Sequence, residues 1–141
     1  MNGLIITGHG SFASGLQTSV KLIAGEQQNI EFVDFVESDS TSDLEKKLNL
    51  ALGRLEGANG VLILCDLVGG SPFKKAVEIS LKNSNIEVIG GANLAMIIET
   101  AIMKDNFPLE ELKNMAVNSG KEAIKAYETK KRRQNGNGVG I

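Results

Sequence analysis

The chain has 141 residues and a mass of 15.0 kDa, with 42% hydrophobic and 23% charged residues, which indicates one globular domain and excludes wholesale disorder. The net charge is −2; because residues 128–141 carry +3, residues 1–127 carry −5, which argues against nucleic-acid binding. No apolar run reaches the roughly 18 residues that a membrane span needs, and the N-terminus does not have the pattern of a secretion signal. Cys65 is the single cysteine and cannot form a disulfide within the chain. We therefore expect a cytoplasmic protein.

The hydrophobic period switches repeatedly between strand-like and helix-like along the chain. The first half predicts a strand at residues 4–7, a helix with Leu16, Val20 and Ile23 on one face, a strand at residues 30–36, and a helix with Leu44, Leu48, Leu52 and Leu55 on one face. Gly25 is expected to end the first helix. The spacing of Ser42 and Glu45 predicts a capping box at the start of the second helix.

The second half continues the same alternation. It predicts a strand at residues 60–65, a helix through Phe73, Ala76, Val77 and Ser80, a strand at residues 86–89, a helix through Leu94, Ile97, Ile98, Ala101 and Ile102, and a last helix that begins with Leu109, Leu112 and Met115. Ser71 is expected as an N-cap with Pro72 at the first helical position, and Gly120 is expected to break the last helix. The strand at residues 60–65 is the most apolar, so we expect it near the centre of the sheet.

Four strand–helix alternations in one small domain predict an α/β fold with an open, mostly parallel four-stranded sheet and helices on both faces. Residues 121–127 fit either a helix or a late edge strand. Residues 130–141 are basic and rich in glycine, which is typical of a disordered tail or a linker. We therefore expect one domain at residues 1–129 and a tail at residues 130–141.

The loops that follow the strands are the places to look for a site, because ligands of such sheets bind beyond the carboxyl ends of the strands, where the strand order reverses. Residues 8–11, 66–72 and 90–93 all contain glycine. Glycine lets the backbone approach a ligand closely and turn its N–H groups toward an anion. Three such loops are expected to meet at one edge of the sheet.

His9 and Asp66 are the candidate catalytic residues, and each has a purely structural alternative. His9, the single histidine, could be held by a backbone carbonyl, but two flanking glycines leave its ring accessible. Asp66 could simply cap a turn. Alternatively, its carboxylate bonds one ring nitrogen of His9, fixes the tautomer and leaves the other nitrogen as a nucleophile. No set of metal ligands accompanies them, so we expect no metal site.

The loop with Gly69, Gly70 and Ser71 opens the third helix. It could be no more than a good helix start. It could also bind an anion, because free N–H groups, the positive end of the helix and the Ser71 hydroxyl would converge there. Together with Gly10, these residues are our candidates for holding a phosphoryl group as it reaches His9.

Residues 8–13 also fit the dinucleotide-binding pattern G-x-G-x-x-G/A, and Asp34 stands where a ribose-binding acid would be expected. The match specifies only three positions, and a second domain for a substrate does not fit in the chain. The phosphate-binding pattern G-x-x-x-x-G-K-[S/T] does not occur. A nucleotide-binding module therefore ranks low, and we expect no cofactor.

The motifs in residues 8–10, 66–73 and 90–100 resemble, in this order, those of the IIA component of the mannose-type (mannose–fructose–sorbose) bacterial sugar phosphotransferase system. The resemblance covers roughly residues 1–127. It implies that His9 takes a phosphoryl group from the phosphocarrier HPr and passes it to a IIB subunit on a separate chain, for sugar uptake through membrane subunits IIC and IID. It also implies a homodimer that exchanges a C-terminal antiparallel strand, for which residues 121–127 are the candidate. The phosphoryl-donor subunit of dihydroxyacetone kinase is the alternative relative.

Overall fold

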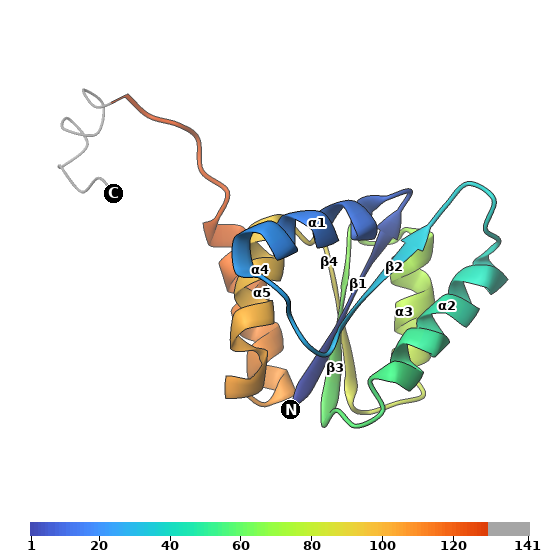
Figure 1. The fold of residues 1–141 in the computed structure, drawn as a ribbon. Helices are drawn as coiled ribbons and strands as arrows, with labels where there is room; N and C mark the ends of the chain where they lie inside the picture. Colours follow the sequence, from blue (N-terminus) through green and yellow to red (C-terminus); the bar gives the residue numbers. More distant parts are fainter. Residues whose placement is uncertain (130–141) are drawn as a thin grey trace.

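The computed structural model describes residues 1–129, in which strands and helices alternate along the chain (Figure 1). The strands are β1 (Asn2–His9), β2 (Ile30–Phe35), β3 (Gly60–Cys65) and β4 (Ile86–Gly90). The helices are α1 (Phe12–Ala24), α2 (Thr41–Arg54), α3 (Ser71–Ser80), α4 (Leu94–Met103) and α5 (Leu109–Glu122), with a short 3-10 turn, η1 (Lys104–Asn106), before α5. Each expected strand and helix is present.

The four strands form one sheet in the order β2-β1-β3-β4, and every strand pair is parallel. This confirms the predicted open α/β sheet, with β3 in the central pair beside β1. Both central strands are almost completely buried. The chain moves from β1 to one edge and then from β3 to the other, so the strand order reverses between β1 and β3.

Helices cover both faces of the sheet (Figure 1): α1, α4 and α5 lie on one face, and α2 and α3 on the other. Side chains alternate along a strand, so β1 supplies both cores, with Leu4 and Ile6 on the first face and Ile5 on the second. The predicted helix faces are correct except at Ile23 and Ile102, which are exposed to solvent. The helical period placed these two residues at the margin of the apolar stripe.

Two helices begin at residues other than those predicted. In α2 the capping box uses Ser40 and Asp43, not Ser42 and Glu45: Asp43 N–H donates to Ser40 Oγ, and Ser40 N–H donates to the Asp43 carboxylate. Both pairs have the required spacing, and Asp43 fills the role usually taken by glutamate or glutamine. In α3 the N-cap is Gly70, which makes Ser71 the first helical residue.

Gly120 does not break the last helix, because α5 continues through it to Glu122. Gly120 is buried, and a Cβ placed there would lie 2.6 Å from Cε of Met96 in α4. The Asn93 side chain, at the start of α4, also donates to the carbonyl of Gly120 at 2.9 Å. The glycine therefore lets α4 and α5 approach closely, and the prediction of a break was wrong.

Residues 123–129 follow α5 as an exposed segment that leaves the body of the domain (Figure 1). They form no strand in the single chain that the structure describes, so the exchanged strand stays a prediction. The predicted tail, residues 130–141, lies outside the described residues. No helix within residues 1–129 is long and apolar enough to cross a membrane.

Candidate active site

The predicted pair of catalytic residues lies where the strand order reverses. His9 is the last residue of β1, and Asp66 directly follows β3. Because β1 and β3 are parallel neighbours, their carboxyl ends meet at the same edge of the sheet. Strand pairing alone thus brings together two residues that are 57 positions apart in the sequence.

One carboxylate binds both the backbone and the ring of the histidine. Asp66 Oδ2 accepts the His9 backbone N–H at 2.8 Å and lies 2.8 Å from His9 Nδ1. The other oxygen, Oδ1, accepts the Leu67 N–H at 2.8 Å. Asp66 therefore caps the turn after β3 and holds the imidazole at the same time. The carboxylate is 13% exposed and the His9 side chain 45% exposed.

The hydrogen bonds keep this carboxylate ionised. Burial by itself would raise the pKa of Asp66, but the bonds from the His9 backbone, the His9 ring and the Leu67 N–H outweigh it and hold the pKa below its usual value. An ionised carboxylate can only accept hydrogen bonds, so the neutral imidazole carries its hydrogen on Nδ1. Nε2 then has a free lone pair, as a nucleophile requires.

Two glycines make this arrangement possible. A Cβ on Gly8 would lie 2.8 Å from Cγ of Asp66, and a Cβ on Gly70 would lie 2.6 Å from Cε1 and 3.3 Å from Nε2 of His9. Gly10, next to His9, has a φ of 60°, a conformation that favours glycine. The glycines of the predicted loops therefore permit close approach to the imidazole, and Gly70 does so on the Nε2 side.

The N-terminus of α3 faces that side of the ring. Gly70 is the N-cap, and no side chain caps the helix, so the N–H groups of its first turn remain available to a ligand. Ser71 opens the helix, and Gly69 precedes it with a φ of 86°. Together with the positive end of the helix dipole, these groups are of the kind that binds anions at helix N-termini.

Phe35, at the end of β2, is a site residue that the sequence analysis missed. Its carbonyl accepts the Gly10 N–H at 2.7 Å, and its ring packs edge-on against the His9 imidazole with centroids 6.0 Å apart. Phe35 is also the register partner of His9 in the parallel pair β1–β2. That register was the signal that could have found it. On the opposite side of the site, Leu67 and Val68 are 59% and 72% exposed.

Asp34, the candidate ribose ligand, has another partner. Its Oδ1 accepts the Ser14 N–H at 2.9 Å, which caps α1 from the neighbouring strand.

Cys65 lies next to Asp66, and burial together with the Asp66 charge raises the pKa of its thiol to about 12, so the thiol stays protonated at neutral pH. Within residues 1–129, no three histidine, cysteine or carboxylate side chains gather as a metal site would require.

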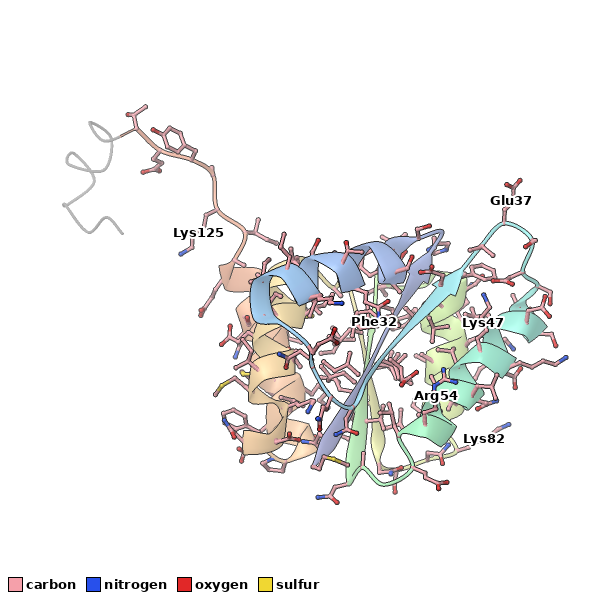
Figure 2. All side chains as sticks on the ribbon, in the orientation of Figure 1. Phe32, Glu37, Lys47, Arg54, Lys82 and Lys125 are labelled. Carbon is pink, nitrogen blue, oxygen red and sulfur yellow. The ribbon has the colours of Figure 1, made fainter. Side chains whose placement is uncertain are left out.

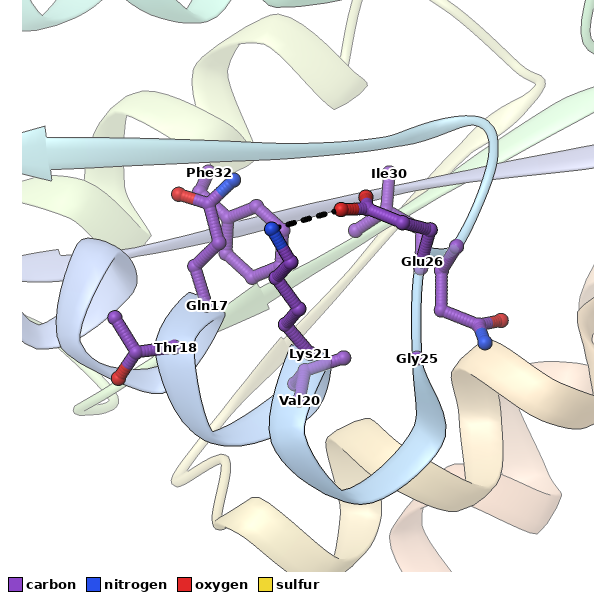
Figure 3. A pocket seen from close by; sticks show the side chains of 9 residues that line it. Gln17, Thr18, Val20, Lys21, Gly25, Glu26, Ile30 and Phe32 are labelled. Carbon is purple, nitrogen blue, oxygen red and sulfur yellow. Dashed lines mark ion pairs between the residues drawn. The ribbon is translucent and has the colours of Figure 1, made fainter.

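A separate pocket of about 280 Å³ lies between the end of α1 and the start of β2 (Figure 3). Phe32 forms part of its wall, and an ion pair between Lys21 and Glu26, 3.0 Å long, crosses it. The pocket is at the opposite end of β2 from Phe35 and His9. It therefore takes no part in the site at the carboxyl edge.

Several proteins with similar sequences are named as components of phosphotransferase systems (PTS). A family model described as "PTS system fructose IIA component" (EIIA-man) matches residues 3–117. The "PTS system mannose-specific EIIAB component" of Escherichia coli (strain K12) is 38% identical over 90% of this chain, which spans 40% of that relative's length. The "PTS system fructose-specific EIIA component" of Bacillus subtilis is 30% identical over 81% of this chain and 78% of its own.

Two solved structures of IIA proteins also superimpose on this chain. The mannose/sorbose-specific IIA subunit from Enterococcus faecalis superimposes with a TM-score of 0.82 at 29% identity, covering 91% of this chain and 96% of that one. The EIIA component from Streptococcus agalactiae gives a TM-score of 0.82 at 29% identity, covering 89% and 97%. The likeness to complete IIA structures thus extends over nearly the whole described fold.

Proposed function

Because the chain belongs to the mannose-type IIA family of the sugar phosphotransferase system, we propose that it is a cytoplasmic phosphohistidine carrier that receives a phosphoryl group from phospho-HPr on His9 and passes it to a IIB subunit. The observation that carries this proposal is the 2.8 Å contact between His9 Nδ1 and Asp66 Oδ2. It leaves Nε2 free beside the N-terminus of α3. Sugar uptake through IIC and IID would follow from the IIB step.

In the first transfer, the Nε2 lone pair attacks the phosphorus of phospho-HPr. The new Nε2–P bond forms as the P–N bond to the HPr histidine breaks, and the electron pair of that bond returns to the HPr ring. The His9 ring becomes positively charged, and the Asp66 carboxylate balances this charge. N–H groups of the first turn of α3 stabilise the phosphoryl oxygens during the transfer.

The second transfer repeats the same chemistry with His9 as the donor. A nucleophile of IIB attacks the phosphorus, the Nε2–P bond breaks, and its electron pair returns to the imidazole. Both steps exchange one bond to phosphorus for another, so this scheme needs neither a metal ion nor a nucleotide on this chain. Leu67 and Val68, which are exposed in the loop directly after Asp66, supply an apolar contact for partner proteins.

The proposal is tested by incubating the full chain with phosphoenolpyruvate, enzyme I and HPr. We expect one acid-labile phosphate, mapped by mass spectrometry to the peptide with His9, and its loss when IIB is added. The matched variant His9→Gln should remain folded, because no core residue changes, and should take up no phosphate. Phosphate uptake by this variant would contradict the proposal. Discharge to a dihydroxyacetone kinase subunit but not to IIB would favour the alternative acceptor.

We further propose a homodimer in which the segment after α5 adds to the sheet edge of a partner. Within residues 1–129, β4 pairs only with β3, so its outer edge is open. A groove of about 480 Å³, lined in part by Val88 and Val117, runs between β4 and α5. Ile124 is 76% exposed and lies in the segment that follows α5. An apolar side chain such as Ile124 of one chain fits the groove between β4 and α5 of its partner.

Two truncations test the dimer by sedimentation. A chain that ends after Thr129 should remain a dimer, whereas a chain that ends after Ala123 should become a monomer. Both truncations keep Gly120 and the helix around it, which the close packing on Met96 requires. A monomeric parent, or a dimer that survives the shorter truncation, would rule out exchange of this segment.

A further inference from the structure

The loop between β2 and α2 is held by an ion pair that the proposed chemistry does not use. Lys47, on α2, donates to Asp39 Oδ2 at 2.6 Å and to the Asp34 carbonyl at 3.1 Å. Asp39 Oδ2 also accepts the Val36 N–H at 3.0 Å, and the Asp39 N–H donates to the Val36 carbonyl at 2.9 Å. We call Lys47, Asp39 and the backbone of residues 34 and 36 the β2 clamp. Figure 2 labels Lys47 on α2 and Glu37 in the same loop.

The clamp is charged at neutral pH and partly shielded from water. The hydrogen bond from Lys47 and the one from the Val36 N–H lower the pKa of Asp39. The Asp39 side chain is only 12% exposed, and that of Lys47 is 38% exposed. A charge-assisted hydrogen bond in this setting is stronger than one between neutral groups. The clamp therefore gives the end of β2 a fixed conformation.

Phe35 lies between the two backbone positions that the clamp holds. Its carbonyl accepts the Gly10 N–H at 2.7 Å, and its ring contacts the His9 imidazole edge-on. The Phe35–Gly10 contact is an isolated antiparallel bridge, which joins the turn after β1 to the end of β2. A displacement of Phe35 would thus move both the turn after His9 and one wall of the imidazole.

We infer that Lys47 is a positioning residue for His9. It acts through the β2 clamp and Phe35 to hold the imidazole with Nε2 toward α3. Asp66 fixes one edge of the ring, and Phe35 flanks the ring from β2. The consequence for phosphoryl transfer rests on the proposed function, whereas the conformation of the turn around Gly10 does not.

Arg54 provides a matched control. It also joins α2 to β2, through a bond of 2.6 Å from its Nε to Glu31 Oε1. This ion pair is equally short and also partly exposed, but it lies near the start of β2, away from Phe35. Figure 2 shows Arg54 farther along α2 than Lys47. Replacing either side chain removes one bond from α2 to β2, to the Asp34 carbonyl for Lys47 and to Glu31 for Arg54. Only the Lys47 bond adjoins Phe35.

The test compares Lys47→Met, Lys47→Arg and Arg54→Met in the full chain. Hydrogen exchange of the Gly10 amide, ¹⁵N shifts of the His9 ring and the kinetics of transfer from phospho-HPr are measured for each. In Lys47→Met we expect Gly10 exchange to accelerate, the His9 ring shifts to change and kcat to fall about tenfold, because a small misplacement of a reacting group is costly. KM should change little. Lys47→Arg should recover most of the rate, and Arg54→Met should match the parent.

The other outcomes overturn the inference. Gly10 exchange and ring shifts in Lys47→Met equal to those in Arg54→Met would show that the clamp does not reach His9. A raised KM with unchanged kcat and unchanged Gly10 exchange would make Lys47 a contact for HPr. A parent that takes no phosphate would refute the proposed function, and the exchange and ring shifts would still decide whether Lys47 positions His9. Thermal unfolding of all three variants checks that each is folded.

Discussion

The two ends of the sheet use their polar groups in opposite ways. At the amino end, Asn2 is 5% exposed, and its side chain donates to the carbonyls of Lys104 and Phe107 at 2.8 and 2.7 Å. Its backbone N–H donates to the carboxylate of Asp105 at 3.0 Å. At the carboxyl end, His9 is accessible, and the first turn of α3 has no side-chain cap.

This difference separates groups that stabilise the fold from groups that can react. At the amino end, the Asn2 side-chain N–H groups donate to carbonyls of the same chain. At the carboxyl end, Asp66 binds one ring nitrogen of His9 and leaves the other for a ligand. A reactive site needs such incomplete pairing, held in place by completed pairing around it. Substitutions at the two ends should therefore change different properties of the protein.

The largest effect on transfer, short of removing His9, is expected from Asp66→Asn. The amide keeps the shape, loses the charge and can donate to Nδ1, which favours the hydrogen on Nε2, where the phosphoryl group must bind. Transfer from phospho-HPr, measured by rapid quench, should fall roughly 100-fold in a protein that remains folded. A rate equal to that of the parent would mean that Asp66 only caps the turn at Leu67.

Gly70→Ala should have the next largest effect. The new Cβ would lie 2.6 Å from His9 Cε1, so the ring must move away from α3 and from its bond with Asp66. We expect transfer to slow about tenfold. Gly53→Ala is the control, because no atom lies within 4 Å of a Cβ there. It should leave transfer unchanged and stabilise α2 by about 0.5–1 kcal/mol. Equal transfer rates in Gly70→Ala and Gly53→Ala would show that the position of α3 beside His9 does not contribute to transfer.

Asn2→Ala tests the amino end of the sheet. A buried carbonyl, that of Lys104, and a partly buried one, that of Phe107, would lose their donor. The free energy of unfolding, measured by urea denaturation, should therefore fall by about 1–3 kcal/mol. The transfer rate of the folded protein should not change. A slower transfer at unchanged stability would show that the two ends are coupled.

The smallest effect is a change in the pH dependence of stability that is expected at both ends of the sheet. Burial opposes ionisation of Asp66, but its hydrogen bonds prevail and depress the pKa; the Asn2 N–H likewise depresses the pKa of Asp105. A depressed carboxyl pKa contributes stability above the unfolded value of about 4, and this stability is lost as the pH falls through the folded value. Asp66→Asn and Asp105→Asn should both flatten the loss of stability below about pH 4, measured by thermal unfolding. Only Asp66→Asn should slow transfer.

The pairing of His9 with Asp66 could be predicted because it depends on strand order and on the ends of two apolar runs. Phe35 could have been placed beside His9 from the register of the parallel pair β1–β2. The bridge from Lys47 could not be predicted, since it depends on the conformation of the loop after β2, where Asp39 lies. Helix starts were ambiguous for a simpler reason: Ser40 and Ser42 both begin a sequence with capping-box spacing. Gly120 was misjudged because its role is the close contact between α4 and α5, which the local sequence does not reveal.

The most direct test of the account is to determine which ring nitrogen of His9 carries the phosphoryl group. The chain, labelled with ¹⁵N in histidine, is phosphorylated by enzyme I and HPr and examined by NMR for ¹⁵N–³¹P coupling. We predict coupling at Nε2, with Nδ1 still protonated and bonded to Asp66. Coupling at Nδ1, or phosphate on any residue other than His9, would contradict the account.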